Sequence, residues 1–183
     1  LMPASSKPAS FAADPGRVRT LAADIAAGRL SPVALVERYL ARIAEADPQV
    51  QCWRAVDGAR ALEIARQRER EVREGRVLGP LHGVPFAVKD IIDVEGLPTR
   101  CQSRSRADAK PAANDAEIVL ALRRAGAIPL GKVHTTEYAF FDPSPARNPH
   151  NLEHTPGGSS SGSAPRLQPA WRRSRSARRQ SPR

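Results

Sequence analysis

The chain has 183 residues, and its 40% hydrophobic and 26% charged composition is typical of one soluble globular domain. The formal net charge is +10, but residues 165–183 hold seven arginines and no acidic residue, which leaves +3 for residues 1–164. This distribution argues against a basic nucleic-acid-binding body. The lack of an apolar run near about 18 residues argues against a membrane span, and two isolated cysteines without a CxxC pair argue against a zinc site. We therefore expect a cytoplasmic protein with reduced thiols, and a disulfide between the two cysteines is the alternative.

Three amphipathic helices are predicted in the first part of the chain. The first two begin at Asp14-Pro15 and Ser31-Pro32, where a side-chain acceptor precedes a proline. Gly28 is expected to end the first helix, and Asp47-Pro48 is expected to end the second. A third helix is predicted over about residues 58–73, with its Arg and Glu side chains in solvent.

The next part of the chain combines strand and helix patterns. A buried strand is predicted over residues 84–88, with Pro85 at its start or at a sheet edge. The following helix is expected to be capped by Asn114 or Asp115, and residues 127–130 form the next predicted strand. A helix followed by a strand at this spacing favours an α/β fold over a helical bundle.

Lys89 is the first candidate functional residue, because it directly follows the apolar strand. A lysine at the end of a buried strand is partly desolvated, which lowers its pKa and lets the neutral amine act as a base. The alternative is a surface lysine that extends from the strand end into solvent, and position alone favours that alternative. Asp90 is either a supporting carboxylate or a cap of the strand end.

A Gly- and Ser-rich segment, Gly157-Gly-Ser-Ser-Ser-Gly-Ser163, lies in a long predicted loop over residues 142–164. Glycines allow backbone conformations that other residues avoid, and the serines supply hydroxyl groups. By composition alone, a flexible linker is the commoner explanation. A phosphate-binding loop is a weaker one, because no Lys-Ser or Lys-Thr follows the glycines.

Two segments together resemble the amidase signature family: Gly79-Pro-Leu-His-Gly-Val-Pro-Phe-Ala-Val-Lys-Asp90 and Thr155-Pro-Gly-Gly-Ser-Ser-Ser-Gly-Ser-Ala164. In that family a lysine follows Gly-Val-Pro-x-Ala-Val, and a serine follows Pro-Gly-Gly. The resemblance covers nearly all of residues 16–164. It implies an α/β fold with a mixed sheet flanked by helices, of which this chain would hold a truncated, N-terminal part.

The resemblance also implies a Ser–Ser–Lys catalytic triad. Lys89 matches the family base, and Ser159 matches the middle serine, which a cis peptide bond precedes in the family, here Gly158–Ser159. Gly157, Gly158 and Ser160 would position the loop or the substrate. Neutral Lys89 would take a proton from Ser159, and Ser159 would take one from a second serine that attacks the amide carbonyl.

The chain departs from the family pattern after Ala164. The family's nucleophilic serine is expected further along, in a glycine-rich segment that this chain lacks. The serines present there, in an arginine-rich context, are Ser174, Ser176 and Ser181. Residues 165–171 can be encoded by codons that, read two bases later, give Ala-Val-Ala-Ala-Gly-Met, which resembles the family's continuation. A frameshift near Ala164 is therefore expected.

Three regions follow from these observations: a disordered N-terminus over 1–13, the N-terminal part of an amidase domain over 14–164, and a disordered out-of-frame tail over 165–183. The implied activity is hydrolysis of a small carboxylic amide without a metal or organic cofactor, and this chain itself is expected to be inactive. The assembly would be a homodimer or a complex of amidotransferase subunits, since the glutamine-hydrolysing component of an amidotransferase is the alternative within the family. A non-catalytic remnant, or a module whose tail binds nucleic acid non-specifically, is the alternative outside it.

Overall fold

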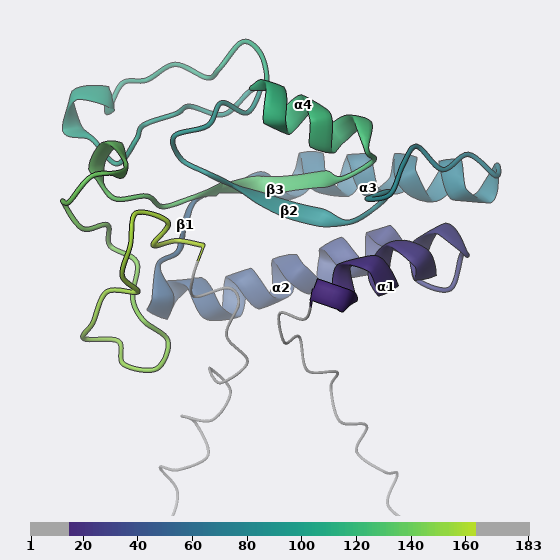
Figure 1. The fold of residues 1–183 in the computed structure, drawn as a ribbon, viewed down its shortest axis with the longest axis horizontal. Helices are drawn as coiled ribbons and strands as arrows, with labels where there is room; N and C mark the ends of the chain where they lie inside the picture. Colours follow the sequence, from purple (N-terminus) through teal and green to yellow (C-terminus); the bar gives the residue numbers. More distant parts are fainter. Residues whose placement is uncertain (1–14, 164–183) are drawn as a thin grey trace, which may run out of the picture.

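A three-stranded mixed sheet with helices on both faces forms the protein (Figure 1). The computed structural model describes residues 15–163, so Asp14, Ala164 and the expectations for residues 1–13 and 165–183 lie outside the described residues. The elements are α1 (Pro15–Ala26), α2 (Pro32–Val50), β1 (Trp53–Val56), α3 (Gly58–Arg73), β2 (Pro85–Lys89), α4 (Glu117–Arg124) and β3 (Ile128–Val133). The predicted class, a mixed sheet flanked by helices, is confirmed.

The sheet has the order β1-β3-β2, with β3 antiparallel to β1 and parallel to β2. Pro85 is the first residue of β2 and lies on an edge strand, as predicted, where its missing N–H costs the sheet nothing. Gly131 lets β1 approach β3 closely, because a Cβ there would lie 2.1 Å from the carbonyl oxygen of Ala55. The close approach therefore requires a glycine in the central strand.

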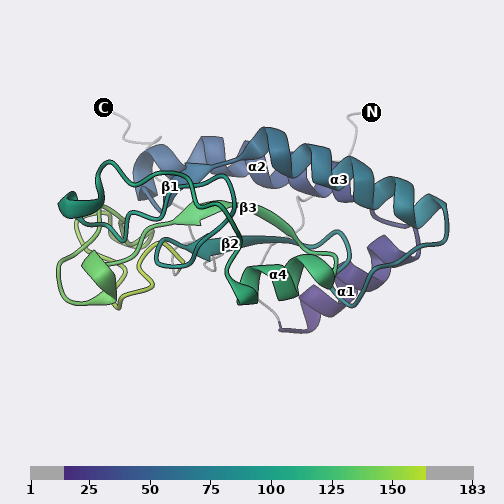
Figure 2. The same ribbon diagram turned by 90° about the horizontal axis from the view of Figure 1, so that it is seen from above.

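Helices pack on both faces of the sheet. Helices α2 and α3 lie side by side on one face, and α4 lies on the opposite side (Figure 2). The larger core cluster joins α2 and α3 to the sheet, and its fully buried members are Val36, Ala61, Ala65, Ile128 and Leu130. A smaller cluster of Val88, Val94 and Val119 joins β2 to α4. Burial of both faces fixes the strands that end at the candidate site.

Helix α2 runs past the proline that was expected to end it. Ser31 is the N-cap as predicted, and its hydroxyl accepts a hydrogen bond from the Ala34 N–H. Pro48 lies inside the last turn, and the helix continues to Val50, followed by the C-cap residue Gln51, whose φ is +47°. Asp47 explains the extension, because its backbone carbonyl accepts from Gln51 and its carboxylate accepts the N–H groups of Cys52 and Trp53. These acceptors hold the chain in place around the proline.

One further expectation was wrong, and one strand was not expected. Helix α4 begins at Glu117 after the N-cap residue Ala116, so neither Asn114 nor Asp115 caps it; the Asp115 carboxylate accepts the backbone N–H of Glu95 instead. Strand β1 was not predicted, since its four residues alternate too briefly to give a sequence signal. Helix α3 has the predicted bounds and is capped by Asp57, whose carboxylate accepts the N–H of Arg60.

The described residues also test the expectations for the long loop, the cysteines and a membrane span. Residues 142–163 form no helix, and their only strand-like feature is a single bridge between Asn148 and Asn151. The sulfur atoms of Cys52 and Cys101 are not joined in a disulfide. Over residues 15–163, no helix combines the length and the apolar character needed to cross a membrane.

Candidate active site

The candidate site lies where β2 and β3 end together. These strands are parallel, and Lys89, the last residue of β2, pairs with Val133, the last residue of β3. The carboxyl ends of parallel strands therefore meet at one sheet edge, which is where ligand sites of open α/β sheets commonly lie. The chain that leaves β3 returns to this edge as a loop over residues 142–163, referred to below as the serine loop.

Gly162 anchors the serine loop against the end of β3. Its N–H donates to the carbonyl oxygen of His134 at 2.9 Å, and the His134 N–H donates to the carbonyl oxygen of Cys52 at the same distance. A Cβ at Gly162 would lie 2.4 Å from the His134 nitrogen and 2.6 Å from the Cys52 oxygen. Because both are backbone atoms, no side chain could move aside, and only glycine fits.

The two serines that precede Gly162 are fixed in different ways. The Ser159 carbonyl oxygen accepts from the Thr136 N–H at 3.2 Å and from the Thr135 hydroxyl at 3.1 Å. The Ser161 side chain is buried and lies 2.6 Å from the Ser144 hydroxyl, within the same loop. The serine loop is thus an ordered structure docked on the sheet, and the flexible-linker interpretation of its composition is wrong.

Lys89 meets the serine loop directly. Its Nζ donates to the Ser159 Oγ at 2.9 Å and to the Ser160 Oγ at 3.2 Å, across about seventy residues of sequence. Burial lowers the pKa of Lys89. Among residues 15–163 no carboxylate forms an ion pair with it. A partly desolvated amine beside two hydroxyls, with no counter-charge, can exchange protons with them.

The backbone before Ser159 differs from the expectation. Gly157 and Gly158 have φ values of +78° and +67°, in the left-handed region that favours glycine. The Gly158–Ser159 peptide bond is trans, because no cis bond occurs among the described residues, so the expected cis bond is wrong for this structure. A non-proline cis bond persists only where its surroundings impose it, and the space around both glycines is open.

Lys132 was not predicted from the sequence to belong to the site. It lies in β3, next to the strand end that carries the candidate site. It is fully buried in β3, and its Nζ lies 3.1 Å from the Asp90 Oδ1. Asp90 forms no ion pair with Lys89, because its carboxylate is paired with Lys132. The available signal was a lysine at the end of an apolar strand, Ala127-Ile-Pro-Leu-Gly-Lys132, the same pattern that identified Lys89.

Other polar side chains near the site contribute to the local structure. Arg147 donates from Nη1 to the Leu152 carbonyl at 3.2 Å, and the Asn148 side chain accepts the His150 N–H at 2.9 Å, so both stabilise turns of the serine loop. The buried imidazole of His134 lies 2.7 Å from the Gln102 Oε1, and burial lowers its pKa. No group of three His, Cys, Asp or Glu side chains in residues 15–163 is arranged to hold a metal ion.

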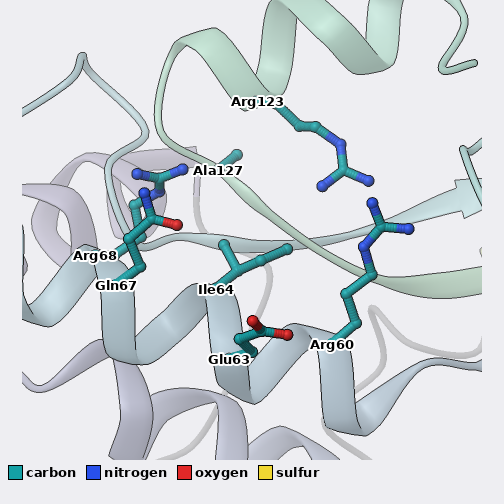
Figure 3. A pocket seen from close by; sticks show the side chains of 7 residues that line it. All are labelled: Arg60, Glu63, Ile64, Gln67, Arg68, Arg123 and Ala127. Carbon is teal, nitrogen blue, oxygen red and sulfur yellow. The ribbon is translucent and has the colours of Figure 1, made fainter.

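A cavity of about 270 Å³ lies elsewhere, between α3 and α4 (Figure 3). Ala127, which precedes the first residue of β3, lines it, whereas Lys89 pairs with the last residue of β3. The guanidinium groups of Arg60 and Arg123 point into it (Figure 3), and they form ion pairs with Glu95 and Asp115. The cavity is therefore separate from the lysine–serine site.

Comparisons with a family model, with related sequences and with solved structures all indicate the same family. The family model named Amidase matches residues 34–166. The glutamyl-tRNA(Gln) amidotransferase A subunits of Lachnospira eligens and Acidothermus cellulolyticus are 36% and 41% identical over 150 residues, which is 79% of this chain.

Solved structures agree with these sequences. Native peptide amidase from Stenotrophomonas maltophilia superposes with a TM-score of 0.72 at 38% identity, over 80% of this chain and 32% of that one. A protein from a vestigial complex connected with the origins of an s-triazine catabolic enzyme superposes with a TM-score of 0.76 at 32% identity, over 83% of this chain and 35% of that one. The chain spans about 31% and 30% of the length of the two curated relatives. On the strength of the family match and the shared fold, the chain belongs to the amidase signature family.

Proposed function

We propose that residues 14–164 are the N-terminal part of an amide-hydrolysing domain in which Lys89 is the base and Ser159 relays protons. The observation that carries this proposal is the 2.9 Å contact between the Lys89 Nζ and the Ser159 Oγ. Neutral Lys89 accepts a proton from Ser159, and Ser159 accepts one from an attacking serine as that serine bonds to the amide carbonyl carbon. The proton returns to the leaving amine, and water then hydrolyses the acyl-enzyme.

The attacking serine and the donors that stabilise the oxyanion lie, in this proposal, in a part of the domain that this chain does not supply. The chain covers about a third of its relatives' length, and residues 165–183 lack the glycine context that a nucleophile segment needs. We therefore also propose a frameshift after Ala164. The completed chain is defined as residues 1–164 continued through the downstream gene in the frame that restores Ala-Val-Ala-Ala-Gly-Met.

The function is tested by comparing the 183-residue chain with the completed chain on simple aliphatic and aryl amides. The 183-residue chain is expected to give no turnover above the uncatalysed rate, and the completed chain is expected to turn over substrate. Turnover by the 183-residue chain would contradict the assignment of the nucleophile. A downstream gene that encodes no amidase continuation in any frame would contradict the frameshift.

The two serines that contact Lys89 should differ in importance. Ser159→Ala in the completed chain is expected to lower kcat by about a hundredfold, because the proton relay is broken. Ser160→Ala is the matched control. The Ser160 side chain is exposed and its contact with Lys89 is longer, 3.2 Å against 2.9 Å, so its kcat should stay within about threefold of the parent value. Equal losses in steady-state amide hydrolysis would show that Ser159 has no special role.

The glutamine-hydrolysing component of an amidotransferase is the second candidate, favoured by the names of the curated relatives. Such a protein would act on glutamine and need partner subunits, whereas a simple amidase would act alone. Ammonia release from glutamine by the completed chain, increased by added partner subunits and absent with aliphatic amides, would decide for this candidate. Under either candidate the roles of Lys89 and Ser159 are the same.

A further inference from the structure

Asp90 and Lys132 form an ion pair that is almost fully enclosed. Their side chains are 1% and 0% exposed, and the Lys132 Nζ lies 3.1 Å from the Asp90 Oδ1. The same Nζ donates to the carbonyl oxygen of Ile92 at 2.8 Å and to the Thr99 hydroxyl at 2.7 Å. An ammonium group has three protons, and here each has an acceptor. Lys132 is therefore held in one orientation, aimed at the Asp90 carboxylate.

The backbone around Asp90 is equally constrained. Its N–H donates to the Val133 carbonyl at 2.9 Å, and its own carbonyl accepts the Cys101 N–H at 3.0 Å. The Asp90 Oδ1 also accepts the Arg100 N–H at 3.4 Å. Asp90 thus extends the pairing of β2 with β3 by one residue beyond Lys89. Its carboxylate cannot turn toward Lys89 without losing the contacts of Oδ1 with the Arg100 N–H and the Lys132 Nζ.

The charge of Asp90 matters because it immediately follows the candidate base. A carboxylate near an amine stabilises the ammonium form and raises the amine's pKa. Lys89 forms no ion pair with Asp90, and the lowered pKa of Lys89 has burial as its cause. In contrast, Asp90 acts on the groups that face it from other segments, since it raises the pKa of Cys101 in addition to burial and counteracts the lowering of the His134 pKa.

The other groups around the pair do not replace Lys132. Burial raises the pKa of the Cys101 thiol, and Asp93 raises it further, while Arg106 and Lys132 act against this. Burial and Arg54 lower the pKa of His134. The thiol and the imidazole are therefore mostly uncharged near neutral pH. Lys132 is the one cation that forms an ion pair with Asp90 within residues 15–163.

We propose that Lys132 is a positioning residue for Lys89: it confines the Asp90 carboxylate in a closed ion pair and so leaves Lys89 able to lose its proton. The catalytic meaning of this inference rests on the proposed function, in which Lys89 is the base. The electrostatic part does not, because the protonation of Lys89 can be measured without turnover.

The experiment is competitive labelling of lysines in the 183-residue chain with trace acetic anhydride, from pH 6 to pH 11, read by mass spectrometry. The chain has only four lysines, Lys7, Lys89, Lys110 and Lys132, so each modified peptide is assignable. Exposed Lys110 is the internal reference. Only the neutral amine reacts, so the pH midpoint of Lys89 labelling follows its pKa.

Two variants isolate the carboxylate charge. Lys132→Met leaves Asp90 without its cation, and Lys89 labelling at pH 8 should fall about tenfold as its midpoint moves to higher pH. Asp90→Asn combined with Lys132→Met removes both charges, and its Lys89 midpoint should return close to the parent value. A fully buried ion pair can often be replaced by uncharged side chains without loss of the fold. Equal midpoints in the two variants would overturn the proposal.

A third variant keeps the test decisive if Lys132→Met does not fold. Asp90→Asn alone leaves Lys132 without its counter-charge, so the Lys89 midpoint should move to lower pH, and an unchanged or raised midpoint would overturn the proposal. In the completed chain, the acid limb of the kcat/KM profile should follow the labelling midpoint of each variant. If labelling shifts and turnover does not, the role of Lys89 as base is wrong, while the confinement of Asp90 stands.

Discussion

Lys89→Ala is expected to lower kcat of the completed chain by about ten-thousandfold, the upper range for loss of a general acid–base group. The amine that contacts Ser159 at 2.9 Å and Ser160 at 3.2 Å would be gone, and no other base is placed to accept the Ser159 proton among the described residues. The measurement is steady-state amide hydrolysis, with single-turnover acylation to confirm that the chemical step has slowed. KM should change little, because the loss is in proton transfer rather than in binding.

Two controls separate base chemistry from structure. Lys89→Arg keeps a cation at the strand end but cannot deprotonate near neutral pH, so it should be nearly as inactive as Lys89→Ala. Lys110→Ala removes an exposed lysine and should keep the parent rate. The parent rate should rise with pH through the pKa of Lys89, because only the neutral amine is active, and burial places that rise below the ordinary lysine range. Near-parent activity in Lys89→Arg would show that Lys89 is no base.

Local sequence signals predicted the start of α2 and the bounds of α3. Ser31 caps α2 as predicted, and Asp57 caps α3, although that cap was not predicted. Such caps act within a few residues of the chain. The prediction was wrong at two places. A distant segment competes for Asp115, whose carboxylate accepts the N–H of Glu95 and so does not cap α4. At the end of α2 the cause is local, because the Asp47 carboxylate accepts the N–H of Cys52 and holds the chain after Pro48, so that the helix continues.

The site could be predicted only in part. Lys89 and Ser159 were found together because two motifs resemble one family, since neither residue predicts the other across the intervening sequence. Strand β1 is defined by its pairing with β3, and a segment of four residues is too short to predict that pairing from its own sequence. Lys132 and Lys89 have similar sequence contexts, yet Lys132 is fully buried, whereas Lys89 contacts the hydroxyl groups of two serines. Which face of a strand end is covered depends on the segments that pack there.

The serine loop depends on a glycine that tertiary contacts alone make necessary. Gly162→Ala is expected to destabilise the 183-residue chain by about 3 kcal/mol, since a Cβ would lie 2.4 Å from the His134 nitrogen and 2.6 Å from the Cys52 oxygen. The loop must then leave the sheet edge and lose the Gly162 N–H bond to His134 and the two bonds that the Ser159 carbonyl accepts from Thr135 and Thr136, each worth about 1 kcal/mol. The midpoint temperature of thermal unfolding, Tm, should fall by about 6–12 °C for a chain of this size.

Gly157→Ala is the matched control for this effect. It alters the same loop with a φ of +78° but meets no atom within 4 Å, so its cost is the backbone strain alone, about 1 kcal/mol. The two variants should also differ at Lys89. When Gly162→Ala releases the loop, Lys89 loses its contacts with Ser159 and Ser160 and becomes more hydrated, so its labelling midpoint should move to higher pH, whereas Gly157→Ala should leave that midpoint unchanged. Equal stabilities and equal midpoints in the two alanine variants would show that docking through Gly162 does not hold the site together.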